Sequence, residues 1–345
     1  MTVEAELRLT PDELRGRIAR IPRIRGFLLG PTPLEEAPRL TEALGGPRIL
    51  IKRDDLTGFA FGGNKVRAIE FRMADVREKG RDAFVLVNVA QSNHARLHAA
   101  ACARLGLKMV IVKPGPKGEA PQGNLLLNRM LGVEIVETGT RDPDELNRIL
   151  DDVMADLRRR GYKPYAHARE PSSRLAGTVG FAEAAIELKE QLDAGDVRAD
   201  HIFMVGGTSS AGLALGGKLL GAGWHVHAVS VGGSAATLLE EEVRLSNRVA
   251  ELLGLPPLMV EADFTTYDEY VGSAYADTPP ATLEAVKLAA RTDAIFLDPV
   301  YTGKAFSGLV GEIRKGRLTR NDTVVFVHTG GLPIIFAFAE VLATL

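Results

Sequence analysis

The 345-residue chain has very little cysteine and few aromatic residues, which make up 6% of it. Its one cysteine, Cys102, cannot form a disulfide within the chain, and no cysteine spacing typical of a zinc site is present. Because Cys102 stands in an alanine-rich stretch, we expect it to be a small core residue. The N-terminal residues 1–16 also lack the apolar core of a signal peptide, so the sequence predicts a cytoplasmic protein.

The chain has no excess of charge of either sign and no long hydrophobic run. Lysine and arginine together number 42, and aspartate and glutamate number 44, for a formal net charge of −2. Nucleic acids and anionic membranes are bound by clearly basic surfaces, so neither is expected as a partner. The longest apolar stretch, residues 332–345, is interrupted by Glu340 and is shorter than the ~20 residues that cross a bilayer.

What remains is the composition of an ordinary globular protein, with 46% hydrophobic and 25% charged residues. A chain of this length is too long for one compact core and suits two α/β lobes. Short apolar runs of the kind found in sheets buried on both faces predict strands. These strands are expected at residues 49–52, 84–89, 109–112, 202–205, 227–231 and 324–328.

Segments with helical periodicity lie between the predicted strands. They are expected at residues 67–79, 92–105, 143–160, 176–192, 210–220, 235–253, 280–292 and 303–315. This alternation predicts two open twisted, mainly parallel sheets with crossover helices. We expect a small lobe of residues 66–170, inserted into a large lobe of residues 1–65 and 171–345. In such folds ligands bind at the carboxyl ends of strands, here in the cleft between the lobes.

Several common motifs are absent. No G-x-G-x-x-G follows a predicted strand, and no H-E-x-x-H occurs. Residues 212–218 match G-x-x-x-x-G-K, but Leu219 stands where a P-loop needs Ser or Thr, and the match falls inside a predicted helix. His94 and His98 are spaced to share a helical face, which favours packing over a metal site. No metal is therefore expected.

Glycine is the most over-represented residue, with 36 copies. One pair, Gly62-Gly63, belongs to the segment KRDDLTGFAFGGNKVR of residues 52–67, which delivers Lys65 to the start of a predicted helix. A lysine is electrostatically misplaced there, because the helix dipole favours anions. Lys65 is thus a candidate for covalent amine chemistry, and from this segment alone a surface lysine after a turn remains open.

Two other helix starts also carry polar residues. Gln91-Ser92-Asn93-His94 follows one predicted strand, and Gly206-Gly207-Thr208-Ser209-Ser210-Ala211-Gly212 follows another. The second loop combines free backbone N–H groups, hydroxyls and a helix dipole, which together favour a phosphate. A reactive lysine and a phosphate loop without a nucleotide motif point to pyridoxal 5′-phosphate held as a Schiff base.

The ordered motifs resemble those of the 1-aminocyclopropane-1-carboxylate deaminase and D-cysteine desulfhydrase family, which has the fold of the tryptophan-synthase β chain. The matching segments extend over residues 31–331: Pro31-Thr32-Pro33-Leu34, residues 52–65, Gln91–His94, residues 206–213, LDPVYTGK of residues 297–304 and HTGG of residues 328–331. The resemblance implies a homodimer and a small amino-acid substrate.

The resemblance also implies residue roles. Lys65 is the expected Schiff-base lysine that moves the substrate α-proton, and Ser92, Tyr275 and Tyr301 are the other expected catalytic residues. Asn93 is expected at the cofactor's phenolate oxygen and His94 at the substrate, together with Ser92, Asn93 and both tyrosines. The remaining expected cofactor-binding residues are Gly207, Thr208, Ser209, Ser210, Ala211, Thr302 and Thr329.

Two threonines address the choice of reaction. Members of the family that open the cyclopropane ring carry Glu at the position of Thr302 and Leu at that of Thr329, whereas desulfhydrase-type members carry Ser or Thr at both. A hydroxyl leaves the pyridine nitrogen largely neutral, which suits β-elimination. D-cysteine is therefore the expected substrate, giving pyruvate, ammonia and hydrogen sulfide.

The chain also departs from the family's pattern at Val89, Leu97, His98 and Val205. These departures leave the substrate open, with an L-cysteate sulfo-lyase or a 1-aminocyclopropane-1-carboxylate deaminase as alternatives. Arg96 and Arg174 are candidates to face a sulfonate, or are solvated. A pyridoxal phosphate-binding protein without turnover is a further alternative, against which the intact set of acid–base residues argues.

Overall fold

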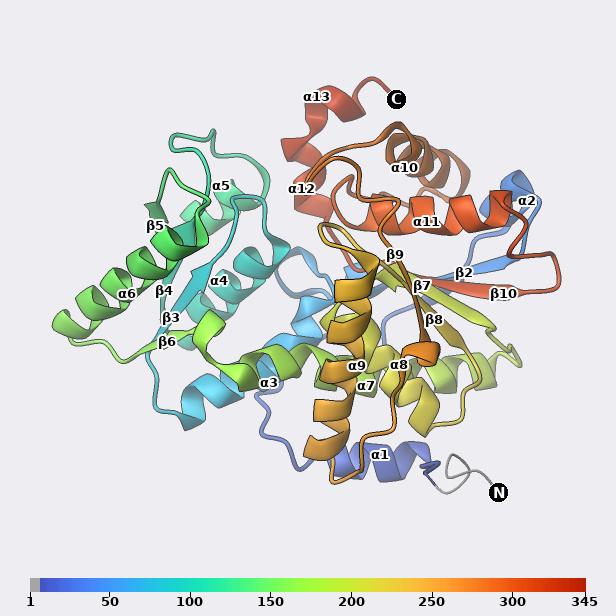
Figure 1. Ribbon diagram of the computed structural model, residues 1–345, viewed down its shortest axis with the longest axis horizontal. Coiled ribbons are helices and arrows are strands. Elements are labelled where there is room, and N and C mark those ends of the chain that lie inside the picture. Colours follow the sequence, from blue (N-terminus) through green and yellow to red (C-terminus); the bar gives the residue numbers. More distant parts are fainter. Residues whose placement is uncertain (1–6) are drawn as a thin grey trace.

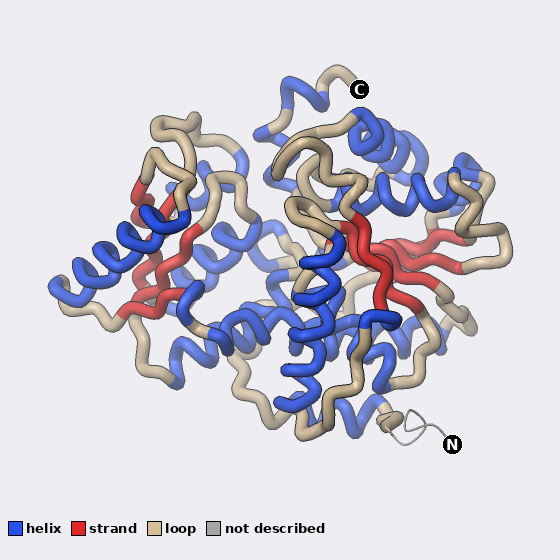
Figure 2. The backbone as a smooth tube through the Cα atoms, in the orientation of Figure 1, coloured by secondary structure: helices blue, strands red, loops and turns tan. Residues whose placement is uncertain are grey.

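The computed structural model describes residues 7–345. Residues 1–6, which are part of the predicted large lobe and of the N-terminal stretch judged not to be a signal peptide, lie outside the described residues. The structure contains two sheets, which Figures 1 and 2 show as two separate groups of strands. The larger sheet has the order β1-β2-β10-β7-β8-β9, and the smaller has the order β5-β4-β3-β6. The pairing is parallel except between β1 and β2, which confirms the predicted fold class.

The helices and strands alternate along the chain. The strands are β1 (Leu34–Glu36), β2 (Arg48–Lys52), β3 (Ala83–Val87), β4 (Lys108–Lys113), β5 (Glu134–Glu137), β6 (Pro164–Ala166), β7 (His201–Val205), β8 (His225–Val229), β9 (Phe264–Tyr267) and β10 (Thr323–Val327). The α-helices are α1 (Pro11–Ile18), α2 (Pro38–Leu44), α3 (Lys65–Glu78), α4 (Asn93–Leu105), α5 (Gly123–Met130), α6 (Pro143–Arg159), α7 (Pro171–Ala194), α8 (Thr208–Leu219), α9 (Ala235–Leu252), α10 (Pro280–Asp293), α11 (Thr302–Arg314), α12 (Leu332–Ala337) and α13 (Ala339–Leu342). Short 3₁₀ turns include η2 (Asp54–Leu56), η3 (Phe59–Phe61), η4 (His167–Arg169) and η5 (Glu261–Asp263).

All six predicted strands and all eight predicted helices are present, with ends shifted by a few residues. The four strands that were not predicted, β1, β5, β6 and β9, are the edge strands of the two sheets. Edge strands are covered on fewer sides than central ones, so they need no continuous apolar run. At three or four residues each, they leave too short a pattern to be recognised.

Both faces of the larger sheet are buried. Ile202 and Met204 pack into one core with residues of α7 and α8, whereas Phe203 points into a second core with residues of α10 and α11. The smaller sheet is likewise covered by α3 and α4 on one face and by α6 on the other. Within residues 7–345, no helix combines the length and the apolar character that crossing a bilayer requires.

The strand order also decides where the polar loops meet. The loop before α4 follows β3, the loop before α8 follows β7, and the His-Thr-Gly-Gly loop follows β10. These are all carboxyl ends of parallel strands, where side chains of different segments can converge on one ligand.

Candidate active site

A tightly packed glycine turn places Lys65 at the first position of α3. Gly62 has φ +64, and a Cβ there would lie 1.9 Å from the carbonyl oxygen of Asp55, so no other residue fits. Thr57 stabilises the turn through two hydrogen bonds: its hydroxyl accepts from the N–H of Gly63 (2.8 Å) and donates to the carbonyl oxygen of Gly63 (3.0 Å). The direction in which Lys65 leaves the backbone is therefore fixed.

The surroundings of Lys65 favour its neutral amine. Burial, followed by the positive charge of Arg96, lowers the pKa of Lys65 to about 8, while Asp298 opposes the shift. The amine Nζ lies 3.3 Å from Oδ1 of Asn64 and 5.8 Å from the centre of the Tyr301 ring. A neutral amine is the form that attacks a carbonyl carbon.

The predicted residues at the start of α4 form a compact polar group. Ser92 caps the helix, its Oγ accepting from the N–H of Ala95 (3.1 Å), which leaves its hydroxyl proton for another acceptor. Asn93 is held by Asn124, whose Nδ2 donates to its Oδ1 (2.9 Å). The ring of His94 follows, and its buried Nε2 has no hydrogen-bond partner among the described residues.

In the predicted phosphate loop, some backbone N–H groups are hydrogen-bonded within the protein and others are free. Gly207 (φ +130) donates its N–H to Ser210 Oγ (2.8 Å) and to Glu242 Oε1 (3.0 Å), and the N–H of Ala211 makes the first bond of α8. The N–H groups of Thr208, Ser209 and Ser210 occupy the first turn of the helix and have no intrahelical partner. Three converging donors at a helix N-terminus are a typical anion site.

The two predicted tyrosines form a pair. The Oη atoms of Tyr275 and Tyr301 are hydrogen-bonded to each other. Burial raises the pKa of both phenols, that of Tyr301 well above its ordinary value. Both rings therefore keep their protons at neutral pH and can donate a hydrogen bond.

The two predicted threonines differ in what their hydroxyls do. The Thr302 hydroxyl donates to Oδ2 of Asp298 (2.8 Å) and accepts from the N–H of the same residue (2.9 Å), and the side chain is fully buried. Thr329 instead uses its backbone carbonyl, which accepts from the N–H of Asn64 (3.0 Å). The Thr302 hydroxyl is thus committed to the turn that begins α11.

One cavity of about 390 Å³ brings part of this set together. Of the predicted residues, Lys65, His94, Thr208 and Ser209 line it. Arg174 lines it as well and is ion-paired with Glu241, whereas Arg96 is buried outside the lining and donates to the carbonyl of Gly62 (2.9 Å). Tyr301 and Thr329 contact cavity-lining residues, the first near Lys65 and the second at Asn64, and Tyr275 is bonded to Tyr301. The Thr302 hydroxyl instead bonds to Asp298.

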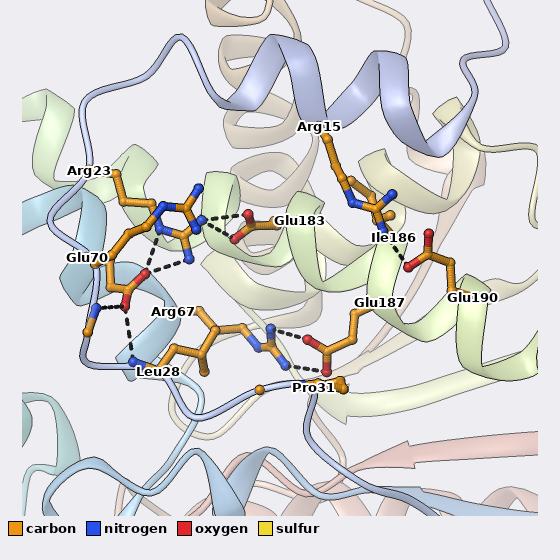
Figure 3. Close-up of a pocket in the computed structure, with 13 residues that line it drawn as sticks. Arg15, Arg23, Leu28, Pro31, Arg67, Glu70, Glu183, Ile186, Glu187 and Glu190 are labelled. Atoms are coloured by element: carbon orange, nitrogen blue, oxygen red, sulfur yellow. Dashed lines mark hydrogen bonds and ion pairs between the residues drawn. The ribbon is translucent and has the colours of Figure 1, made fainter.

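The lining of this cavity contains basic residues and no aspartate or glutamate. A second cavity of about 410 Å³, drawn in Figure 3, makes the contrast clear. There Arg23 pairs with Glu70 and Glu183, Arg67 with Glu187, and Arg15 with Glu190. The cavity beside Lys65 has the unbalanced positive charge that an anionic ligand would neutralise. Within residues 7–345, no group of three or more His, Cys, Asp or Glu side chains is arranged to hold a metal ion.

Sequence reasoning assigned no role to Arg72, Asn64, His167, Glu242 or Asp298. Arg72 carried a usable signal, since it follows Lys65 by seven residues and therefore shares its face of α3. The other four depend on contacts between distant segments. The apparent P-loop match of residues 212–218 lies inside α8, as its context indicated.

The fold and the site define a pyridoxal phosphate enzyme, and the family comparison agrees. Residues 27–330 match the family described as pyridoxal-phosphate dependent enzyme, and the chain belongs to this family. The D-cysteine desulfhydrase of Klebsiella pneumoniae (strain 342) is 37% identical over 327 residues, covering 93% of this chain and 97% of that protein.

Solved structures give the same result. A crystal structure of an ACC deaminase homologue superposes with a TM-score of 0.86 at 32% identity, covering 96% of this chain and 98% of that one. The threonine deaminase isoform 2 of Solanum lycopersicum has a TM-score of 0.63 at 20% identity, with 94% of this chain and 86% of that one covered, and shares the fold.

The residues present fit pyridoxal phosphate. Lys65 is available to bind its aldehyde, the N–H groups of residues 208–210 suit its phosphate, and the cavity supplies positive charge for a dianion.

Proposed function

We propose that this chain catalyses β-elimination on D-cysteine, with pyruvate, ammonia and hydrogen sulfide as products. The observation that carries the proposal is the position of Lys65, a buried amine with a lowered pKa beside the phosphate-binding start of α8. The likeness to a D-cysteine desulfhydrase over nearly the whole chain supports this choice of substrate.

Pyridoxal phosphate, when bound, supplies an electron sink for negative charge at the substrate α-carbon. The Lys65 amine takes the α-proton, and the start of α4 holds the substrate carboxylate through its free N–H groups and the Ser92 hydroxyl. Asn93 orients the cofactor's phenolate oxygen. The Tyr275–Tyr301 pair donates a proton toward the departing sulfur as the C–S bond breaks. One water molecule is consumed for each D-cysteine that is converted to pyruvate, ammonia and hydrogen sulfide.

Thr302 and Thr329 support elimination over ring opening, because neither places a carboxylate where the pyridine nitrogen would need one.

The experiment that tests this function measures keto-acid release by the purified holoenzyme, resolved by mass, with D-cysteine, L-cysteate and 1-aminocyclopropane-1-carboxylate in parallel. Pyruvate and sulfide from D-cysteine, absent in Lys65→Ala, are the expected result. Sulfite from L-cysteate would instead indicate a sulfo-lyase, and 2-oxobutyrate from the cyclopropane would indicate a deaminase. No turnover of any amino acid would favour a pyridoxal phosphate-binding protein.

We also propose a homodimer located in the cytoplasm. Support for the dimer comes from exposed apolar side chains on the adjoining helices α5 and α12, namely Leu126, Met130, Leu332 and Phe336. The single, buried free cysteine is compatible with a reducing compartment. A mass of one chain by light scattering would refute the dimer, and cell fractionation tests the compartment.

We propose, finally, that residues 66–170 form a small lobe and residues 7–65 and 171–345 a large one. The four strands of the smaller sheet fall within the first range, and the six of the larger sheet fall outside it. Native-state hydrogen exchange in which the strands of each sheet open as a unit separate from the other sheet is the expected result.

A further inference from the structure

Arg72 is a buried cation that forms no ion pair with any of residues 7–345. Its side chain is 3% exposed, and its bonds go to neutral groups: from Nε to the carbonyl oxygen of Ser173 (2.9 Å) and to Ser173 Oγ (2.9 Å), and from NH1 to His98 Nε2 (2.7 Å). Asp75, one turn further along α3, is already bonded to Lys79 (3.0 Å) and to the Tyr165 hydroxyl (2.6 Å). Asp75 acts on Arg72 only through space, and a buried charge without a bonded counterion is costly. An anionic ligand beside Arg72 would therefore stabilise it.

Arg67 on the same helix shows what a fully paired arginine looks like. It is buried to a similar degree, and it contacts Asp54 (2.8 Å) and Glu187 (3.0 Å). Its pKa is raised despite burial because of these carboxylates, whereas burial lowers the pKa of Arg72 to about 10. The two arginines differ in their partners and not in their exposure.

Arg72 belongs to the cavity that contains Lys65. Lys65, Ala68 and Arg72 all line it, and their spacing of three and four residues puts them in one row on α3. The guanidinium of Arg72 is bonded to Ser173 and His98, and, in addition to burial, its positive charge lowers the pKa of Lys65. The small side chain of Ala68 leaves the space between them open.

His98 holds the guanidinium of Arg72 in place. The Nδ1 of His98 lies 2.7 Å from the carbonyl oxygen of His94 and must donate to it, so Nε2 carries the lone pair that accepts from Arg72. Burial lowers the pKa of His98 well below its ordinary value and keeps this acceptor free of a proton. His98, which departs from the family's pattern, is thus explained as the partner of Arg72.

The start of α8 also lines the cavity. Thr208 and Ser209 belong to the lining, and their backbone N–H groups stand in the first turn of α8, where they have no intrahelical partner. The packing of α7 is so close there that a Cβ on Gly177 would lie 2.4 Å from Thr208 Oγ1. We propose that Arg72, held by His98 and Ser173, binds the phosphate of pyridoxal phosphate from the side facing these N–H groups, with His98 as its positioning residue. This rests on the family's cofactor and not on the identity of the amino-acid substrate.

The test compares two ligands of the apoenzyme, pyridoxal phosphate and pyridoxal, which differ only in the phosphate. A charge-assisted hydrogen bond contributes ~1.5–3 kcal/mol, so Arg72→Gln should weaken pyridoxal phosphate about 10- to 100-fold and leave pyridoxal nearly unchanged. Arg72→Lys should keep part of the preference. His98→Leu should lower it as well, while a purely structural role would weaken both ligands together.

Two controls separate this site from general effects. Arg174→Gln removes a cavity-lining arginine that already has Glu241 as its partner, and Arg15→Gln removes one from the cavity of Figure 3. Both should keep the wild-type preference for the phosphorylated ligand. The proposal would be overturned if Arg174→Gln, but not Arg72→Gln, lost the preference for pyridoxal phosphate over pyridoxal. It would also be overturned if Arg72→Gln lost affinity equally for both ligands.

The wild-type protein gives an independent measurement, should the variants fail to fold. Inorganic phosphate should raise the unfolding temperature of the apoenzyme and compete with pyridoxal phosphate but not with pyridoxal. An unchanged unfolding temperature at saturating phosphate would contradict an anion site in this cavity. The result does not depend on turnover of D-cysteine.

Discussion

The backbone N–H of Asn64 donates to the carbonyl oxygen of Thr329 at 3.0 Å, which joins the turn that carries Lys65 to the loop that follows β10. The two segments are more than 260 residues apart in the sequence, yet Gly330 packs directly on Gly63. Lys65, the lysine proposed to bind the cofactor, is therefore positioned by two segments that are far apart in the sequence.

This contact predicts a large effect of a small substitution. Gly330 has φ +106, and a Cβ there would lie 2.8 Å from the Cα of Gly63, so Gly330→Ala should separate the two segments. Gly316→Ala is the matched control, because Gly316 also has positive φ (+71) but nothing within 4 Å. We expect about 1 kcal/mol of destabilisation in the control from backbone strain. Gly330→Ala should cost about 2–4 kcal/mol in denaturant unfolding and also weaken cofactor binding. Equal effects of the two substitutions would contradict the packing argument.

The lowered pKa of Lys65 predicts the pH dependence of cofactor loading. Because only the neutral amine attacks the aldehyde, the rate at which apoenzyme combines with pyridoxal phosphate should rise with pH and level off above about 8. Arg96→Gln removes a positive charge that lowers this pKa, so the curve should move to higher pH, whereas Arg96→Lys should leave it in place. Stopped-flow absorbance of the cofactor measures the rate. A shift of Arg96→Gln to lower pH would contradict the electrostatic role.

The two threonines should respond differently to loss of their hydroxyls. Thr302→Val removes both hydrogen bonds to the buried Asp298, so we expect about 1–3 kcal/mol of destabilisation. Thr329→Val keeps the carbonyl that holds Asn64, so stability should change by less than about 1 kcal/mol while the pH titration of the bound cofactor's absorbance shifts. Chemical denaturation and a spectroscopic titration of both variants test this. A stable Thr302→Val with an altered cofactor spectrum would reverse the two assignments.

Glu242, under the phosphate loop, should make stability depend on pH. Burial raises its pKa from 4.5 to about 7, so the folded protein holds this proton more tightly than the unfolded chain does. The stability that results is fully present below about pH 4.5 and is lost as the pH rises through about 7. Glu242→Gln should therefore lose less stability than wild type between pH 5 and pH 8, by less than about 3 kcal/mol. Glu240→Gln, on an exposed position of the same helix, should behave as wild type. Urea unfolding of the apoenzyme at both pH values gives the comparison.

Much of the fold could be predicted because its central elements carry strong local patterns. The strands β2, β3, β4, β7, β8 and β10 are buried runs, and their loops lead into helices with clear periodicity. The edge strands were missed because a run of three or four residues is too short to show a pattern, even in β6, where all three residues are buried. Lys65 and the start of α8 could be proposed as site residues for the same reason, since a glycine turn and a cluster of hydroxyls before a helix have a local physical meaning.

The sequence by itself determined the alternation of strands and helices, the order of the polar loops and the choice of pyridoxal phosphate. Only the tertiary structure decided which charges are paired. Arg67 and Arg72 are the same residue type on one helix, but the fold brings Asp54 and Glu187 to the first and Ser173 and His98 to the second. Partners 13 to 120 residues away in the chain leave no local pattern, so the difference between the paired Arg67 and the unpaired Arg72 becomes visible only when the chain is folded.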